Sequence, residues 1–141
     1  MSRHTTSVTR EVTVYVSVEG ERRVPLPARW HYDRSDPYAV RLCLGEPVAR
    51  PVTWVFARDL LMEGMRRPAG VGDVLVFPRH RCLPGIARIV LRSTGGAALI
   101  EIAVPEVTGF LESTCDLVPT GTESLHIDIE GGLAELTGRS D

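Results

Sequence analysis

The sequence predicts an α+β fold in which a run of antiparallel strands leads directly into a helix, and does so twice. Valines alternate with polar or aromatic residues over residues 12–18, a period of two that is typical of a strand with one buried face. Residues 52–56, which favour a strand, continue without a linker into the helical segment 57–64. Residues 97–104 continue in the same way into a helix that Pro105 opens at a favourable first-turn position.

The first half of the chain predicts four strands and one helix. The strands cover residues 12–18, 28–32, 38–44 and 52–56. Residues 33–37, rich in Asp, Ser and Pro, form the turn between the second and third strands. The helix that follows the fourth strand ends at Gly64, a residue type that commonly terminates helices.

The second half returns to strands and ends in helices. After a loop over residues 68–72, strands are predicted over residues 73–77, 85–91 and 97–104. The helix opened by Pro105 has one apolar face at helical spacing, formed by Val107, Phe110, Leu111 and Thr114. A last helix is predicted near residues 129–136, although its two glycines weaken it by roughly 1 kcal/mol each relative to alanine. The order is four strands, helix, three or four strands, helix, helix, in a single domain over residues 1–141.

Composition and charge favour a cytoplasmic protein without direct membrane insertion. The 141 residues are 43% apolar and 24% charged, values that are ordinary for a globular domain. The longest apolar run, residues 97–100, is far shorter than a membrane helix, and no signal-peptide pattern opens the chain. Cys43, Cys82 and Cys115 are odd in number and widely spaced, which fits a reducing compartment better than a disulfide framework.

No pattern in the sequence predicts an enzyme, a metal or a cofactor. His80 and Cys82 could share one face of a strand, but they lack a third ligand. Serine-nucleophile signatures are missing, and no pair of carboxylates can be selected as acid and base without a fold. An enzyme remains the third hypothesis, which a cleft with convergent ionisable groups would revive.

Three motifs, in order and with matching gaps, carry a resemblance to a known family. Residues 32–40 match Y-D-x-x-D-P-Y-A-V, residues 54–61 match W-x-F-A-R-D-L-L, and residues 64–74 match G-x-x-x-P-x-G-x-G-D-V. The chain thereby resembles the SsgA-like sporulation and cell-division proteins of actinobacteria. The motif positions, expected to be mainly structural, are Tyr32, Asp33, Asp36, Pro37, Tyr38, Trp54, Phe56, Ala57, Arg58, Asp59, Leu60, Leu61, Gly64, Pro68, Gly70, Gly72 and Asp73.

The resemblance implies both a fold and a function. The fold is an antiparallel, β-barrel-like sheet with flanking helices, similar to Whirly-type proteins and assembled as a homotrimer. The function is that of a non-enzymatic adaptor at division septa during sporulation. Members of the family help to bring the tubulin-like division protein FtsZ to future septum sites, together with an SsgA-type paralogue. The family has no catalytic residues to carry over to this chain.

The second motif also predicts which side chains are buried. The apolar side chains are expected in the core, namely Trp54, Phe56, Leu60 and Leu61. Arg58 and Asp59 are expected either to be exposed or to form a structural ion pair.

The alternative function is a single-stranded nucleic-acid-binding module, because Whirly-like sheets elsewhere bind single strands. Binding of this kind needs a basic groove and aromatic side chains on which the bases stack. The net charge of −2 and the aromatic content of 6% disfavour it, and nucleic acid is not expected as a partner.

Overall fold

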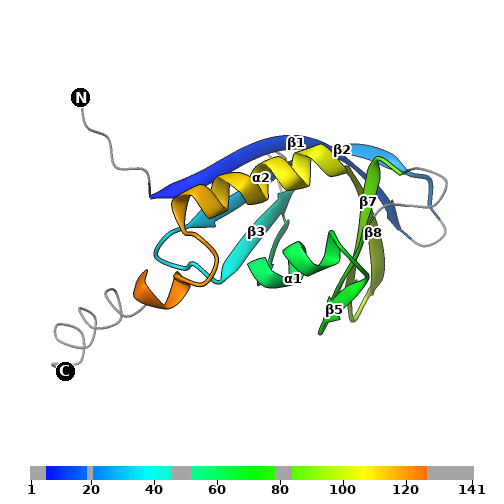
Figure 1. Cartoon of the computed structure of the whole chain (residues 1–141). Coiled ribbons are helices and arrows are strands. Elements are labelled where there is room, and N and C mark those ends of the chain that lie inside the picture. The colour runs from blue at the N-terminus through cyan, green and yellow to red at the C-terminus, as the bar shows by residue number, and fades with distance from the viewer. Residues whose placement is uncertain (1–5, 19–20, 46–51, 79–83, 127–141) are drawn as a thin grey trace, which may run out of the picture.

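The computed structural model describes residues 6–18, 21–45, 52–78 and 84–126, and their strands form one eight-stranded antiparallel sheet (Figure 1). The strands are β1 (Ser7–Val18), β2 (Val24–Asp33), β3 (Ala39–Leu44), β4 (Val52–Ala57), β5 (Ala69–Val71), β6 (Val74–Phe77), β7 (Ile86–Ser93) and β8 (Gly96–Ala103). Helix α1 (Arg58–Gly64) follows β4, and helix α2 (Val104–Leu117) follows β8. The predicted order of four strands, a helix, further strands and a helix is therefore found.

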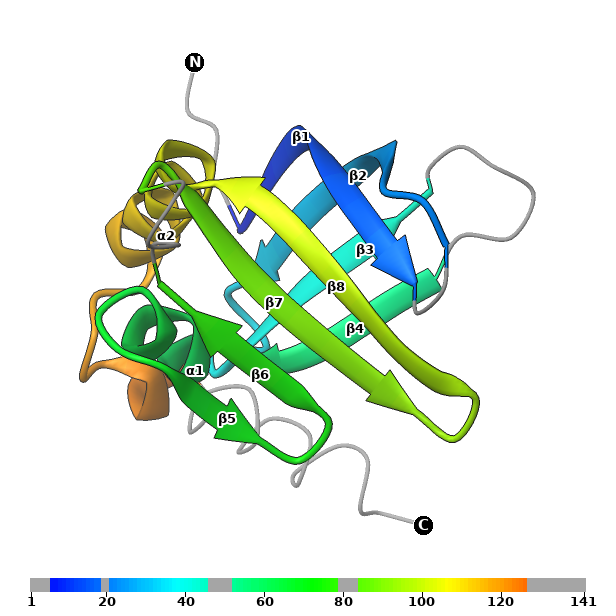
Figure 2. The same ribbon diagram turned by 90° about the vertical axis from the view of Figure 1, so that its right-hand side faces the viewer.

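The sheet curls into a half-barrel because its long central strand changes partners. Residues 7–16 of β1 pair with β2, but only residues 15–18 pair with β8. Strand β8 therefore diverges from the first half of β1, and α2 packs beside β1 in the space that this leaves. The strand order is β4-β3-β2-β1-β8-β7-β6-β5, which places β4 and β5 at the two edges. Figure 2 shows both helices at the same end of the half-barrel.

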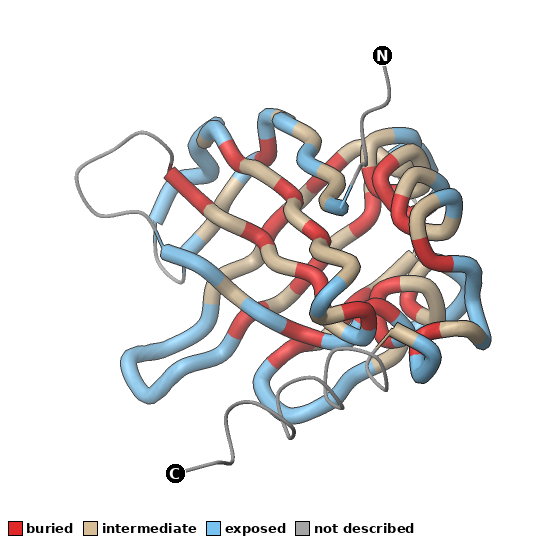
Figure 3. Tube along the Cα trace, turned by 90° about the vertical axis from the view of Figure 1, so that its left-hand side faces the viewer, coloured by how far each residue is buried: buried red, intermediate tan, exposed pale blue. Residues whose placement is uncertain are grey.

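Alternating side chains from both halves of the sheet fill the interior. Figure 3 shows buried and less buried positions alternating along the strands. The ring of Trp30 stacks on Phe110 of α2 at 5.3 Å between centroids, and meets Phe56 edge-on at 6.1 Å. The inward face predicted for α2 is confirmed by its buried residues, which are Val107, Phe110, Leu111 and Thr114. The core is thus built where the sheet and α2 meet.

Three strands differ from the sequence prediction. Strand β1 begins at Ser7, five residues before the predicted start. The predicted loop over residues 68–72 contains β5, which forms a hairpin with β6 around Gly72 and Asp73. Gly72 has a φ of 60°, as the first central position of a tight hairpin turn requires. Strand β2 begins four residues before the predicted start, despite Pro25 and Pro27. Its ladder with β3 begins only at Ala28, so these prolines interrupt no pairing on that side.

The helix predicted near residues 129–136 lies outside the described residues. The described chain ends in a helical turn over residues 123–126, beyond α2.

Candidate functional site

The second motif lies where β4 runs directly into α1. Ala57, in extended conformation, caps the helix, and the amide of Arg58 donates a hydrogen bond to the carbonyl oxygen of Tyr38 at 2.7 Å. This bond ties the start of α1 to the turn before β3. Helix α1 begins without a connecting loop, and the side chain of its first residue, Arg58, is fully buried.

The guanidinium of Arg58 joins three segments that are distant in the sequence. Its Nη1 donates to the carbonyl oxygens of Thr114 at 3.2 Å and Val118 at 2.8 Å, both at the C-terminal end of α2. Its Nη2 donates to Oε2 of Glu123 at 2.7 Å. It also lies over the ring of Tyr32, 5.0 Å from the centroid. Arg58 therefore holds the segment after α2 against the junction of β4 and α1.

The electrostatics of this cluster favour a charged Glu123 and a neutral Tyr32. Burial would raise the pKa of Glu123, but hydrogen bonds from Arg58 and from the amide of Gly121 hold it below its ordinary value. Burial raises the pKa of the Tyr32 hydroxyl to about 12, although the charge of Arg58 acts in the opposite direction. At neutral pH the cluster is an ion pair beside a neutral phenol, with no group poised to exchange a proton.

The first motif forms the turn between β2 and β3. The Tyr32 hydroxyl donates a buried hydrogen bond to the carbonyl oxygen of Pro37 at 2.8 Å. The Asp33 carboxylate accepts from the amide of Ser35 at 2.9 Å and from its hydroxyl at 2.8 Å. These bonds, led by the one from the Ser35 amide, lower the pKa of Asp33. Asp36 lies within 3.6 Å of Arg41 on the neighbouring strand, and Tyr38 is exposed.

The third motif closes α1 onto the β5–β6 hairpin. Gly64 is buried against Val76, and a side chain at this position would overlap that valine. Gly70 lies close to Leu75 in the same way, so both glycines allow a close approach of backbone and side chain. Pro68, Gly72 and Asp73 are exposed around the turn.

The burial predicted for the second motif is confirmed at three positions and corrected at two. Phe56, Leu60 and Leu61 lie in the core, as expected. Trp54 packs against the core only in part, because it lies near the open end of the half-barrel. Of the two possibilities given for Arg58, exposure is wrong and a structural ion pair is found, although its partner is the buried Glu123. Asp59 is exposed, as expected, and forms no ion pair among the described residues.

Sequence reasoning missed Glu123 as a partner of Arg58. Glu123 lies outside all three motifs, 65 residues from Arg58 along the chain, in a segment that the sequence left without a prediction. Nothing in the local pattern singles it out from the other carboxylates of the chain. Only the return of the chain beyond α2 brings it to the arginine.

Four motif positions are left at the surface around the start of α1. We call Asp36, Tyr38, Ala57 and Asp59 the junction surface. Tyr38 is 45% exposed, and Asp36 carries a side chain that is about half exposed. Ala39 pairs with Ala57, and the amide of Arg58 binds the Tyr38 carbonyl, so these residues are neighbours in space. Core packing does not require these exposed side chains, which makes the junction surface a candidate for contact with a partner protein.

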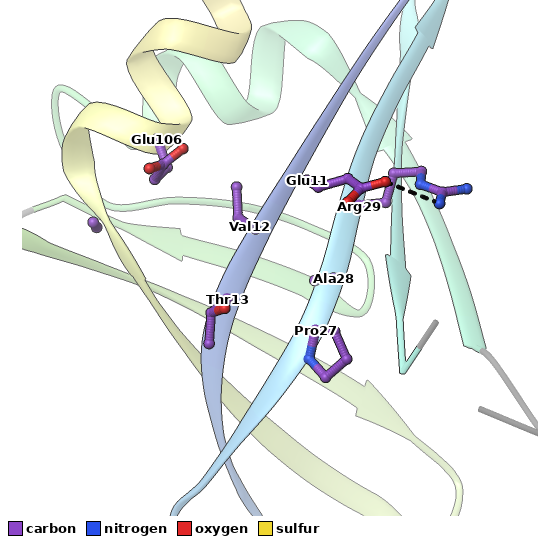
Figure 4. A pocket seen from close by; sticks show the side chains of 8 residues that line it. Glu11, Val12, Thr13, Pro27, Ala28, Arg29 and Glu106 are labelled. Atoms are coloured by element: carbon purple, nitrogen blue, oxygen red, sulfur yellow. Dashed lines mark hydrogen bonds and ion pairs between the residues drawn. The ribbon is translucent and has the colours of Figure 1, made fainter. Parts of the chain in front are cut away.

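Figure 4 shows a separate pocket where β1 diverges from β8. This outer pocket has a volume of about 720 Å³. Glu106, in the first turn of α2, points from one side toward β1, where it binds Arg10 at 2.9 Å. On the other side Glu11 and Arg29 form a cross-strand ion pair at 3.3 Å. Each of these carboxylates already has a cationic partner, so the pocket brings together no acid and base as a catalytic cleft would.

The open end of the half-barrel forms a second, apolar pocket of about 490 Å³. None of the residues that line it is charged; they are Val18, Leu26, Leu44, Gly45, Val52, Trp54, Leu91, Ser93, Gly95, Gly96, Ala97 and Ala98. Their chemistry suits apolar contact rather than proton transfer or ligation of a metal.

Metal ligation finds no support in the part of the chain that the structure describes. There, no three His, Cys, Asp or Glu side chains come together as a metal site would require. His80 and Cys82, the pair considered from the sequence, lie outside the described residues. Among the described helices, none has both the length and the apolar character needed to cross a membrane.

Solved structures of two other proteins share this fold. An SsgA-like sporulation-specific cell division protein from Thermobifida fusca has a TM-score of 0.84 and 40% identity, covering 96% of this chain and 99% of that one. A structure of SsgB, described with mutations that correlate to longitudinal cell division during sporulation of Streptomyces coelicolor, has a TM-score of 0.79 and 41% identity. It covers 89% of this chain and 99% of that one.

The sequence comparisons agree with the structural ones. The sporulation-specific cell division protein SsgB of Streptomyces coelicolor is 40% identical over 135 residues, which are 96% of this chain and 98% of that protein. The family model described as Streptomyces sporulation and cell division protein, SsgA, matches residues 26–123. That range contains all three motifs as well as Glu123, the partner of Arg58. The chain belongs to the SsgA family.

Proposed function

We propose that this protein is a non-enzymatic adaptor in sporulation-specific cell division, of the SsgB type, which helps to position FtsZ at septum sites. The observation that carries the proposal is the match over nearly the full length of relatives named sporulation-specific cell division proteins. The site geometry supports it, because the ionisable groups of the motifs form ion pairs or turn hydrogen bonds, as Arg58 and Asp33 do, or are exposed without a partner among the described residues, as Asp59 is.

The motif residues support this role in two ways. Most of them build the frame, since the Arg58 cluster, the Asp33 turn and the Gly64 contact hold strands, helices and turns together. The junction surface, by contrast, presents to solvent the ring of Tyr38, the carboxylate of Asp59 and, in part, that of Asp36. Aromatic side chains on rigid supports are typical anchors of protein–protein contacts. We therefore place the partner contact at Tyr38 and Asp59.

A pull-down from sporulating cells tests the proposal. The tagged full chain serves as bait, and the captured material is scored for FtsZ, for an SsgA-type paralogue and for nucleic acid. Enrichment of the division proteins over a bait of unrelated sequence supports the adaptor role. Capture of nucleic acid alone would overturn it, if the logarithm of the binding constant also falls linearly with the logarithm of the salt concentration, as neutralisation of phosphates requires.

Four further features belong to the same proposal. The whole chain, residues 1–141, acts as one domain, and its curled sheet is of the Whirly-like type. The protein forms a homotrimer, since the half-barrel leaves β4 and β5 as open edges that association can cover. It acts in the cytoplasm at division septa. The nucleic-acid alternative gains no support from the relatives, whose names refer to sporulation and cell division.

A further inference from the structure

The outward side of β6, β7 and β8 carries a row of aliphatic side chains where an open sheet face usually carries polar ones. Leu75, Val90 and Leu99 are direct cross-strand partners, Leu75 with Val90 and Val90 with Leu99. Their neighbours along each strand, such as Val76, Ile89 and Ile100, are buried on the inner side. The three side chains therefore point outward, and Figure 2 shows no described helix over this side of the sheet. We call it the outer face.

Beside this row, the outer face carries a guanidinium that has no acidic partner in the described part of the chain. Phe77, Arg88 and Glu101 are cross-strand partners in the next row. Glu101 lies opposite Arg88, but its carboxylate forms an ion pair with Arg23 at 2.6 Å rather than with Arg88. Arg88 lies over the ring of Phe77 at 5.4 Å, forms no ion pair with the described residues, and its buried Nε has no hydrogen-bond partner.

Along β7 the outer face alternates between positive and aliphatic side chains. Arg88, Val90 and Arg92 follow one another at every second residue and so lie on one side of the strand. Arg92 is exposed, and the nearest carboxylate by register, that of Asp73, forms no ion pair with it in the described structure. The face thus presents cation, aliphatic and cation at a spacing of roughly 6.6 Å per step.

We propose that the outer face of β7 binds an extended segment of a partner protein that carries acidic residues at positions i and i+4 and an aliphatic residue at i+2. An extended chain has the same rise per residue as β7, so its side chains at i, i+2 and i+4 match the spacing of the three side chains on β7. In either chain direction, the two acidic residues meet Arg88 and Arg92, and the aliphatic residue meets Val90. The carboxylates supply the partners that the two guanidiniums do not find among the described residues. The aliphatic residue covers Val90 between Leu75 and Leu99.

Charge complementarity favours this occupant over a second copy of the chain. A copy that applied the same face to itself would oppose Arg88 and Arg92 to arginines, which costs free energy. This inference rests on the proposed adaptor role, and it adds a binding face separate from the junction surface. The junction surface lies at the turn before β3, the end of β4 and the start of α1, whereas the outer face belongs to β6, β7 and β8, which lie in front of β3 and β4 in Figure 2.

The test is an NMR titration of the full chain with two synthetic heptapeptides. One has glutamates at its second and sixth positions, valine at the fourth and serine elsewhere; the other has glutamine in place of each glutamate. The expected result is saturable shifts of amide signals in β6, β7 and β8 with the glutamate peptide. The glutamine peptide should bind at least about tenfold more weakly, since it lacks both charge-assisted contacts.

Matched variants separate the face from nonspecific charge effects. Arg88→Gln together with Arg92→Gln should weaken the glutamate peptide about tenfold, whereas Arg66→Gln, at an exposed position in the turn after α1, should leave its affinity unchanged. Thermal melting confirms that each variant is folded. Because Arg88 packs on Phe77, the Arg92→Gln single variant serves as a second measurement if the double variant unfolds.

Three outcomes of the titration and variant measurements would overturn the inference, as would failure to bind the glutamate peptide at all. They are equal affinity for the two peptides, shifts located outside β6 to β8, and loss of self-association when Leu99 is changed to serine, which would make the face an interface between copies. A wild-type chain that captures FtsZ but does not bind the peptide overturns this inference alone. A chain that binds the peptide but captures no division protein contradicts the proposed function instead.

Discussion

The guanidinium of Arg58 donates a hydrogen bond of 2.7 Å to Glu123, and the two side chains are only 1% and 8% exposed. Arg58 opens α1, whereas Glu123 lies beyond the end of α2. The ion pair therefore spans the junction of the two helical segments and holds the chain beyond α2 against the half-barrel. When an ion pair is this deeply buried, removing one partner leaves the other charge buried without compensation, which destabilises the fold.

The first prediction is that Arg58→Ala destabilises the protein by about 3–5 kcal/mol, because it leaves the carboxylate of Glu123 buried and uncompensated. An exposed Arg58, one of the two possibilities that the sequence left open, would cost only about 0–1 kcal/mol when replaced, but the observed burial of Arg58 raises the expected cost. Asp59→Ala is the control and should change stability by less than about 0.5 kcal/mol, since Asp59 is exposed. Chemical denaturation of both variants measures the difference; an Arg58→Ala protein as stable as wild type would contradict the role of the pair.

The second prediction concerns acid stability. The pKa of Glu123 is lowered in the folded state from an ordinary value of 4.5, so its contribution to stability is complete above that value. The contribution is lost as the pH falls through the lower pKa of the folded state. Glu123→Gln should therefore unfold with a shallower dependence on pH below about 4.5, although it is less stable at pH 7. The pKa of Asp33 is also lowered in the folded state, so the stability of both the wild type and the Glu123→Gln variant still falls in acid to some extent.

The third prediction tests the core at the end of β4. Phe56→Ala should cost about 3–5 kcal/mol, because it removes a buried ring that meets Trp30 edge-on. Trp54→Ala should cost less, since Trp54 is only partly buried near the open end of the half-barrel. Thermal melting measures the stability of the two variants. A Trp54→Ala protein less stable than Phe56→Ala would show that Trp54, rather than Phe56, is the more deeply buried residue.

The fourth prediction concerns the junction surface. Tyr38→Ser and Asp59→Asn should leave the melting temperature within a few degrees of wild type, because both residues are exposed. Each should reduce the capture of FtsZ in the pull-down and the number of sporulation septa in cells. Ser35→Ala, in the neighbouring turn, is the control for a local change of structure. Normal septation in a Tyr38→Ser, Asp59→Asn double variant would exclude this surface as the partner contact.

The fifth prediction is that the purified protein has three times the chain mass of 15.5 kDa. Light scattering across micromolar concentrations measures it. A constant mass of one chain would refute the trimer while leaving the family assignment intact.

The local pattern of the sequence determined which segments form strands and helices. The alternating valines over residues 12–18 and the apolar face of α2 could be recognised because each depends on neighbours within one element. The family motifs, likewise, are continuous in sequence. The turn chemistry of Gly72 also decided the β5–β6 hairpin, but a strand of three residues, β5, is too short to show a period of its own.

Only the tertiary structure decided where the charges lie. In the sequence, Arg58 stands next to Asp59, and this local pattern predicts that Arg58 is exposed to solvent or forms an ion pair. Its actual partner, Glu123, arrives after eight strands and two helices have been placed, because the burial of α2 brings the following segment back to α1. The outer row of Leu75, Val90 and Leu99 depends in the same way on the register of three strands. Contacts between distant segments are set by how the layers pack, and no single segment encodes them.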